Sequence, residues 1–213
     1  MAIDLLPAYL QNYLDGLVPP RPPEMQAMEA YAKETNFPII GPASGYLCYL
    51  ITRLAGARRV YEMGSGYGYS TAWFAKAVKE NGGGTVYHTV WDAELSRQAR
   101  RHLAALGYED IIHYQVSEAV QALKETQGPF DVIFNDIDKP GYPASLPVIR
   151  EKLRSGGILI TDNLLFHGTV FEPENHTDST QAIREYTRLL STDPDWISSI
   201  VPVRDGVMIS YKK

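Results

Sequence analysis

Glu62-Met63-Gly64-Ser65-Gly66-Tyr67-Gly68-Tyr69-Ser70 is the stretch from which the architecture of this chain can be inferred. A short β-prone run, residues 59–63, leads into the glycines, and residues 70–80 continue with apolar side chains at helical spacing. Glycines let a backbone turn tightly and approach a ligand closely. The stretch therefore predicts a strand, a glycine loop and a helix whose first amides can bind a carboxylate.

The same alternation continues downstream. We expect strands at residues 85–91, 111–116, 130–134 and 157–161, and helices at residues 95–106, 118–126, 145–153 and 180–190. Residues 196–203 and 206–211 are typical of a terminal hairpin. Strands that alternate with helices form parallel βαβ units. The sequence thus predicts an α/β fold with a doubly wound, mostly parallel seven-stranded sheet and an antiparallel C-terminal hairpin.

The segment before the first strand is expected to be helical. Apolar side chains recur at helical spacing at Leu5, Tyr9, Tyr13 and Leu14, and the prolines of residues 19–23 interrupt this pattern. Two further helices are expected at residues 24–35 and 45–54. A length of 213 residues suits one domain, residues 1–213, with residues 1–55 as a helical N-terminal extension.

Composition excludes several classes of protein. The net charge is -5 and no basic stripe is present, which argues against nucleic acid as a partner. No run of 18 apolar residues exists, and the first residues lack the pattern of a signal peptide. A single cysteine, Cys48, rules out an intrachain disulfide. We expect a cytoplasmic protein that does not bind membranes.

The glycine loop discriminates between nucleotide-type ligands. A dinucleotide fingerprint needs a third glycine where Tyr69 stands, and the lysine of a phosphate-binding loop is missing. This disfavours an NAD-linked oxidoreductase. The pattern G-x-G-x-G after the acid Glu62 resembles motif I of class I methyltransferases. An acid suits a donor that carries an ammonium and a sulfonium, whereas it would repel a pyrophosphate. A purely structural turn is the alternative.

Polar side chains follow two further strands at their carboxyl ends, where ligands bind to such sheets. Asp136 comes after strand 130–134, and Asp162 and Asn163 come after strand 157–161. Two carboxylates and an amide oxygen form a hard-oxygen set suited to Mg²⁺, Ca²⁺ or Mn²⁺. Taken singly, Asp162 could be a helix cap and Asn163 could hold a turn at positive φ. Their joint placement favours a metal site.

Lys139 stands three residues after Asp136. A bound dication and a desolvated cleft would make its amine a usable base. A simple ion pair to Asp136 or Asp138 is the alternative.

With these segments the chain resembles the metal-dependent O-methyltransferases, the group of catechol and caffeoyl-coenzyme A O-methyltransferases. The resemblance runs from about Gly41 to the C-terminus. Besides motif I, it is carried by Asp136-Ile137-Asp138-Lys139-Pro140-Gly141-Tyr142, a D-x-D-K-x-x-Y signature, and by Asp162-Asn163-Leu164-Leu165-Phe166-His167-Gly168, a D-N loop.

The resemblance implies a class I methyltransferase fold, S-adenosylmethionine as donor, a divalent metal and a homodimer. It implies metal ligands at Asp136, Asp162 and Asn163, with Lys139 and Asp136 catalytic. It places the donor beside Asp136 and against six further residues: Glu62, Gly64, Gly66, Tyr69, Ser70 and, near the adenine, Glu118. The acceptor would be a hydroxylated, catechol-like small molecule. Tyr142, Phe166 and Trp91 are candidates for its pocket, with core packing as the alternative, and His167 for a supporting role.

One position departs from the family pattern. Relatives usually carry an acid at the end of the second strand for the ribose hydroxyls, and here Val90 stands there. Asp92 would face the same side if the strand continues, and could substitute. Two rival interpretations remain open: a metal-independent methyltransferase, and a binding protein without catalysis on the same fold.

Overall fold

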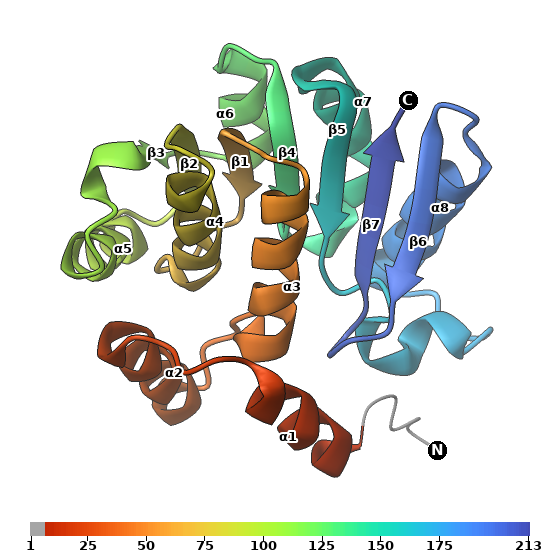
Figure 1. Cartoon of the computed structure of the whole chain (residues 1–213). Coiled ribbons are helices and arrows are strands. Elements are labelled where there is room, and N and C mark those ends of the chain that lie inside the picture. Colours follow the sequence, from red (N-terminus) through yellow and green to blue (C-terminus); the bar gives the residue numbers. More distant parts are fainter. Residues whose placement is uncertain (1–6) are drawn as a thin grey trace.

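The computed structural model describes residues 7–213, which form a seven-stranded sheet with helices on both faces (Figure 1). The strands are β1 (Arg59–Met63), β2 (Thr85–Val90), β3 (Ile112–Val116), β4 (Phe130–Asn135), β5 (Leu153–Thr161), β6 (Trp196–Val201) and β7 (Val207–Lys212). Their order is β3-β2-β1-β4-β5-β7-β6. β1 to β5 pair in parallel, and β7 pairs antiparallel with both β5 and β6. The expected fold class is confirmed.

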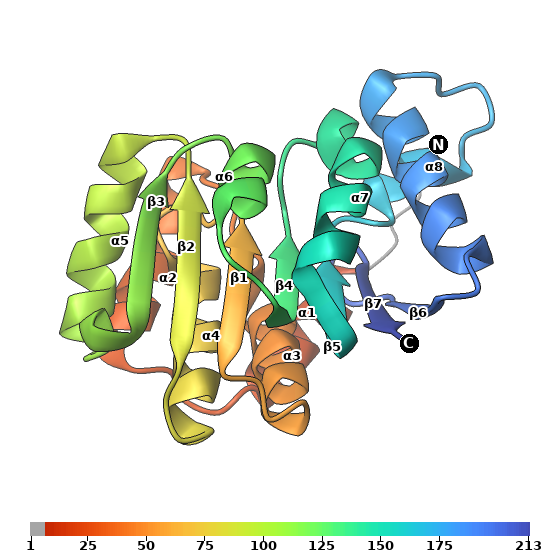
Figure 2. The ribbon, with the colours of Figure 1, turned by 90° about the horizontal axis from the view of Figure 1, so that it is seen from above.

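The helices separate into two layers. They are α1 (Ala8–Leu17), α2 (Pro23–Thr35), α3 (Gly41–Leu54), α4 (Tyr69–Glu80), α5 (Ala93–Ala105), α6 (Ala119–Glu125), α7 (Tyr142–Lys152) and α8 (Asp178–Thr192), with short 3-10 turns at Glu109–Ile111, Lys139–Gly141 and Phe166–Phe171. Seen from above, α3 and α4 cover one face of the sheet, and α6, α7 and α8 cover the other (Figure 2).

Each face has its own apolar core. The first core joins α3, α4 and α5 to the sheet through side chains such as Cys48, Phe74 and Leu103. The second is built by α6, α7 and α8, with Leu123 and Tyr186 among its fully buried members. Because both faces are covered, the central strands β1 and β4 are almost entirely buried, as is usual for such sheets. Their carboxyl ends are left to carry the polar side chains.

Several boundaries differ from the expected ones for local reasons. α3 begins at Gly41 instead of residue 45, and α7 at Tyr142 instead of residue 145; each has a proline in its first turn, where the missing N–H costs nothing. β5 begins at Leu153 instead of residue 157, because Leu153 pairs with Phe130 of β4. β2 ends at Val90 instead of continuing to residue 91.

Helices α1 and α2 are observed in the segments where the sequence predicts helices. Of the expected first helix, Leu5 lies outside the described residues, as does the start of the 1–55 extension, whereas Tyr9 and Tyr13 lie in α1. Between residues 7 and 213, no helix has the length and apolar character needed to cross a membrane.

Candidate functional site

A cavity of about 760 Å³ opens at the carboxyl ends of β1, β2, β4 and β5. Its volume lies in the usual range for small-molecule sites, and its place is the one expected for ligands on a doubly wound sheet. Of the residues proposed from the sequence, the following line it: Gly64, Gly66, Tyr69, Ser70, Asp136, Lys139, Asp162 and Asn163, together with Trp91, Phe166 and His167. Glu62, Asp92, Glu118 and Tyr142 are not among the lining residues, and Tyr142 is instead packed in the core.

The glycine loop is held against the tip of β4. Gly64 has φ +87°, and a Cβ at this position would overlap the main-chain carbonyl of Asp136. Its amide and that of Ser65 donate to the carbonyl of Thr89 at 3.2 and 2.9 Å, which ties the loop to β2 as well. Only glycine combines this backbone conformation with so close an approach. The loop therefore stands at the junction of three strand ends.

Glu62 lies beneath this loop and is fully buried. The hydroxyl of Thr71 donates to its Oε2, whereas its Oε1 has no hydrogen-bond partner among the described residues. Burial raises the pKa of Glu62 to about 7, and the neighbouring hydroxyls of Ser70, Thr71 and Ser65 oppose that rise. A direct contact from Glu62 to a donor molecule stays a prediction.

Helix α2 fastens the outer side of the loop. The hydroxyl of Tyr67 donates to the carbonyl of Met28 at 2.9 Å, and that of Tyr69 donates to Glu29 Oε1 at 2.8 Å. Glu29 also accepts two bonds from the guanidinium of Arg21, at 2.9 and 3.0 Å. The sequence offered no signal for Arg21 and Glu29, because an ion pair within a helical extension is usually a solvated surface feature.

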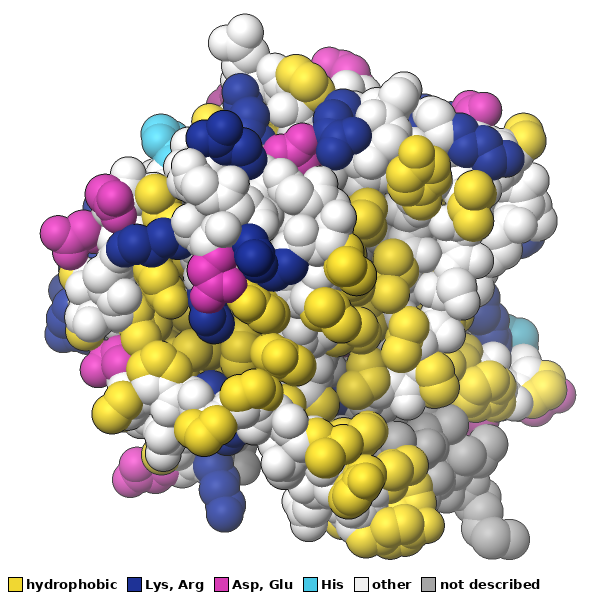
Figure 3. All heavy atoms as spheres, viewed as in Figure 1, with side chains coloured by type: hydrophobic (Ala, Val, Ile, Leu, Met, Phe, Trp, Pro, Cys, Tyr) yellow, Lys and Arg dark blue, Asp and Glu magenta, His cyan; other side chains and the backbone are white. Residues whose placement is uncertain are grey.

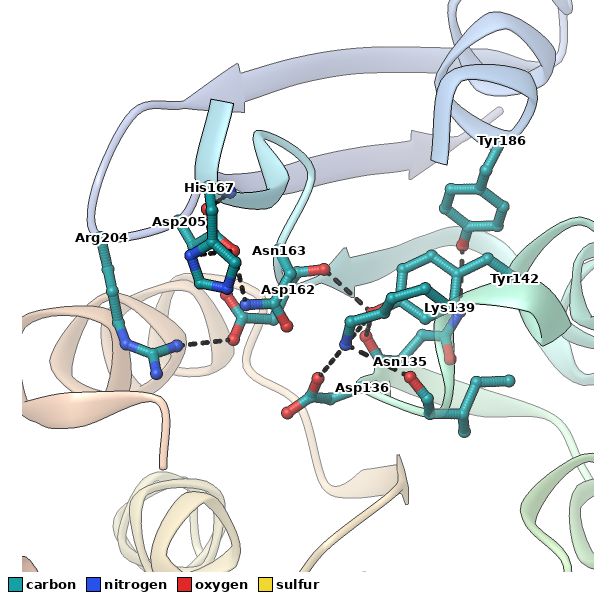
Figure 4. Close-up of polar contacts among 11 residues, drawn as sticks. Asn135, Asp136, Lys139, Tyr142, Asp162, Asn163, His167, Tyr186, Arg204 and Asp205 are labelled. Carbon is teal, nitrogen blue, oxygen red and sulfur yellow. Dashed lines mark hydrogen bonds and ion pairs between the residues drawn. The ribbon is translucent and has the colours of Figure 1, made fainter. Parts of the chain in front are cut away.

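Asp136 and Lys139 lie at the end of the cavity that also holds Asp162, which is called here its acidic end (Figure 4). Lys139 Nζ donates to Asp136 Oδ1 at 2.8 Å, to the hydroxyl of Tyr142 at 3.0 Å and to the carbonyl of Ile137 at 3.2 Å. Three acceptors match the three N–H groups of an ammonium. The ion pair considered from the sequence is thus present.

Asp162 faces the same space from the tip of β5 (Figure 4). Its Oδ2 accepts from Arg204 Nη1 at 3.2 Å, and its buried Oδ1 has no hydrogen-bond partner among the described residues. Burial raises the pKa of Asp162 to about 7, and the charge of Asp136 adds to the rise. The carboxylates of Asp136 and Asp162, at the ends of β4 and β5, therefore interact electrostatically.

Asn163 is fixed by the turn between β6 and β7. It has φ +64°, the turn conformation considered from the sequence, and its Nδ2 donates to Asp205 Oδ2 at 3.1 Å. The other carboxylate oxygen of Asp205 accepts the amide of His167 at 2.6 Å. One buried acid thus orders the loop that follows β5, and its bond to the Asn163 amide nitrogen leaves the amide oxygen for another partner.

The chemistry of this donor set fits a hard divalent cation. Asp136, Asp162 and Asn163 supply carboxylate and amide oxygens, and the unpartnered buried Oδ1 of Asp162 is the kind of atom that a cation satisfies. No group of three or more His, Cys, Asp or Glu side chains suited to a metal occurs within residues 7–213, so any metal here depends on the amide as third ligand.

Two acids named from the sequence serve as helix caps. Because β2 ends at Val90, the strand does not carry Asp92 toward the cavity; its Oδ1 accepts the amides of Glu94 and Leu95 at 2.7 and 3.1 Å and begins α5. Glu118 accepts two amides at the start of α6 in the same way. The condition under which Asp92 would replace the ribose-binding acid is therefore not met. Val90 and the 78% exposed Trp91 line the cavity instead.

Comparison with known proteins gives a consistent picture. A family model described as O-methyltransferase matches residues 24–213. A catechol O-methyltransferase from Niastella koreensis is 25% identical over 190 residues, which cover 86% of this chain and 85% of that protein. The structure of a methyltransferase from Geobacter sulfurreducens superimposes with a TM-score of 0.83 at 30% identity over 99% of each chain. The O-methyltransferase TomG from Streptomyces achromogenes, solved in complex with SAM, superimposes with a TM-score of 0.86 at 23% identity over 96% of each chain.

Proposed function

The chain belongs to the O-methyltransferase family, and from that membership we propose that it transfers a methyl group from S-adenosylmethionine to a hydroxyl group of a catechol-like small molecule, with a divalent metal at the acidic end of its cavity. The observation that carries this proposal is the position of one cavity, with the glycine loop on one side and Asp136, Lys139, Asp162 and Asn163 on the other.

The loop side suits the donor. Tyr69 and Ser70 open helix α4, whose free N-terminal amides and dipole favour the carboxylate of a methionine moiety. The exposed indole of Trp91 offers a flat surface on which an adenine can stack. The complex of the Streptomyces relative with SAM supports the same choice of donor.

The apolar lining of the cavity suits an aromatic acceptor. Ile39, Ile40, Pro140 and Phe166 line the same cavity as the polar cluster. An aromatic ring with two neighbouring oxygens would place its apolar body on these side chains and its oxygens at the carboxylates. The name of the Niastella relative, a catechol O-methyltransferase, supports this class of acceptor.

Asp136, Asp162 and Asn163 would hold the divalent ion, Mg²⁺, Ca²⁺ or Mn²⁺, through their side-chain oxygens. A bound dication lowers the pKa of a coordinated hydroxyl and so supplies an oxyanion at neutral pH. Lys139, whose Nζ lies 2.8 Å from Asp136 Oδ1 and 3.0 Å from the Tyr142 hydroxyl, would in its neutral form take the acceptor proton.

Methyl transfer from a sulfonium is an in-line displacement, so orientation of the acceptor oxygen toward the methyl carbon contributes much of the rate. The contact between Gly64 and the carbonyl of Asp136 fixes the distance between the donor side and the acidic side. The protein's part in the reaction is therefore to hold two substrates at a set separation and to exclude water between them.

The proposal is tested by calorimetry and by product analysis. We expect purified protein to bind S-adenosylmethionine and to methylate a catechol probe, with activity lost in chelator and restored by Mg²⁺ or Mn²⁺. Asp136→Ala should abolish both activity and metal dependence. Full activity in chelator would support the metal-independent alternative, and absence of donor binding would support the non-catalytic one.

A homodimer is part of the proposal. Helix α1 has no buried residue, and Tyr9, Tyr13 and Leu17 are 77%, 65% and 63% exposed. Leu50 and Leu54 on α3 are also exposed, and Figure 3 shows hydrophobic side chains gathered over these two helices. Contiguous apolar surface of this kind is typical of an interface. Light scattering coupled to size-exclusion chromatography should give twice the mass of one chain for the wild-type protein. The same measurement on Tyr13→Glu should give the mass of a single chain.

A further inference from the structure

Arg204 occupies a backbone conformation that favours glycine. It lies in the turn between β6 and β7 with φ +51°, and Gly206 follows with φ +83°. A left-handed conformation costs free energy for an L-residue with a side chain and costs glycine almost nothing. Strain of this kind persists only where the surrounding structure holds the residue in place, and it is common at functional sites.

The side chain of Arg204 reaches the buried carboxylate of Asp162. Its Nη1 donates to Asp162 Oδ2 at 3.2 Å, and this is the one hydrogen bond of the guanidinium within residues 7–213. The Asp162 side chain is 2% exposed and that of Arg204 is 31% exposed, and both residues line the cavity. The bond therefore joins a buried carboxylate to a partly exposed guanidinium. Figure 4 shows the guanidinium approaching Asp162 from the side opposite Lys139.

Both carboxylates proposed as metal ligands already have a cationic partner without an added ion. Lys139 pairs with Asp136 at 2.8 Å, and Arg204 pairs with Asp162 at 3.2 Å. Each of these two acids thus has a basic side chain beside it. The affinity of an oxygen site for a divalent cation depends on the net charge of its ligands, and a guanidinium on one carboxylate removes much of that attraction.

We propose that Arg204 is a built-in cation that competes with the divalent metal for Asp162, so that metal binds by displacing the guanidinium and with an affinity set by that exchange. This inference rests on the metal part of the proposed function. Asp162 keeps a cationic partner in both states, which spares this buried carboxylate the cost of standing alone. The displaced guanidinium, already on the cavity wall, stays near the acceptor.

The test compares Mn²⁺ binding, by calorimetry and by electron paramagnetic resonance, in the full-length wild-type protein and in Arg204→Gly. We expect the variant to bind Mn²⁺ at least about tenfold more tightly, because one competing charge is gone. Arg204→Lys keeps a cation and should stay within a few-fold of wild type. Asn36→Gly is the matched control: it also places glycine at a positive φ, +54°, but lies outside the cavity lining, and its Mn²⁺ affinity should be unchanged.

Equal or weaker Mn²⁺ binding by Arg204→Gly would overturn the inference, and so would the absence of Mn²⁺ binding in every variant. Should Arg204→Gly not fold, as judged by circular dichroism, Arg204→Gln carries the same expectation. Titration of S-adenosylmethionine into the same samples separates the two proposals. If the wild-type protein binds S-adenosylmethionine but Arg204→Gly does not change the Mn²⁺ affinity, only the inference about Arg204 fails. If the wild-type protein does not bind S-adenosylmethionine, the methyltransferase proposal fails, whether or not Mn²⁺ binds.

Discussion

The hydroxyl of Tyr142 donates to the main-chain carbonyl of Asp162 at 2.9 Å while it accepts a hydrogen bond from Lys139 at 3.0 Å. A single buried side chain therefore joins the proposed base to the tip of β5. Tyr142→Phe should lower the free energy of unfolding by about 1–3 kcal/mol, because it leaves a buried carbonyl and one N–H of Lys139 without a partner. Chemical denaturation measures this loss. The rate of methyl transfer should also fall, because Lys139 loses one of the acceptors that orient its amine.

Tyr186→Phe is the matched control for Tyr142. Its hydroxyl is also buried and pairs with Thr161 Oγ1 at 3.1 Å, but it does not contact Lys139. We expect a comparable loss of stability with an unchanged rate of methyl transfer. Equal rates in the two variants would show that Tyr142 has no special influence on Lys139.

Gly64→Ala should separate steric overlap from backbone strain. Gly64 and Gly83 share φ +87°, but a Cβ at Gly83 meets nothing within 4 Å, whereas at Gly64 it meets the Asp136 carbonyl. Gly83→Ala should lower the free energy of unfolding by about 1 kcal/mol, because alanine is less stable than glycine at a positive φ. Gly64→Ala should cost clearly more and should also abolish donor binding, because the loop must move away from β4. Equal destabilisation of the two variants, measured by denaturation, would contradict the close approach.

Trp91→Ala should weaken the binding of S-adenosylmethionine by about 1–3 kcal/mol if the indole stacks on the adenine, and Trp91→Phe should retain most of the affinity. Trp73 and Trp196 are buried at 3% and 5% exposure, so Trp91 is the one strongly exposed tryptophan. Donor binding should therefore change the long-wavelength tryptophan emission of the wild-type protein, whereas the emission of Trp91→Phe should stay nearly the same when the donor binds. An unaltered affinity in Trp91→Ala would place the adenine elsewhere.

Glu62 makes stability depend on pH. Burial raises its pKa from an ordinary 4.5 to about 7, so between these values the folded protein keeps a proton that the unfolded chain releases. The free energy of unfolding should thus fall as pH rises from about 4.5 to 7. Glu62→Gln should flatten part of this slope and stabilise the ligand-free protein by roughly 2–3 kcal/mol at pH 8, with little effect at pH 4. Calorimetric melts at the two pH values test it, and a parallel slope in the variant would refute it.

Most of the fold could be predicted from the sequence because apolar periodicity changes sharply between strands and helices. β1 matches its predicted bounds, residues 59–63. The start of β5 was missed because Ser155 and the glycines that follow suggest a turn, whereas pairing of Leu153 with Phe130 begins the strand before them and the register shifts across them. Pairing between distant segments overrides local preference, and a single sequence does not reveal it.

The convergence of Asp136, Lys139, Asp162 and Asn163 on one cavity could be predicted because parallel strands end at the same edge of a sheet. Arg204 and Asp205 could not. They lie 42 residues beyond Asp162 and Asn163, and only the antiparallel pairing of β7 with β5 brings their turn to the site. The capping role of Asp92 was missed because bonds from its carboxylate to nearby helix amides are decided by where β2 ends; a contact between Asp92 and the donor stays a prediction.

The attachment of α2 to the glycine loop has a consequence for how this enzyme can be shortened or fused. Tyr67 and Tyr69 anchor the loop to Met28 and Glu29, some 40 residues upstream. A fragment that begins at β1 would keep every strand of the sheet but lose the two hydrogen bonds that hold the outer side of the glycine loop, the proposed donor site. We therefore expect the smallest active unit to include α2, and replacement of that helix by a tag or a fusion partner should abolish activity although every residue of the polar cluster is retained.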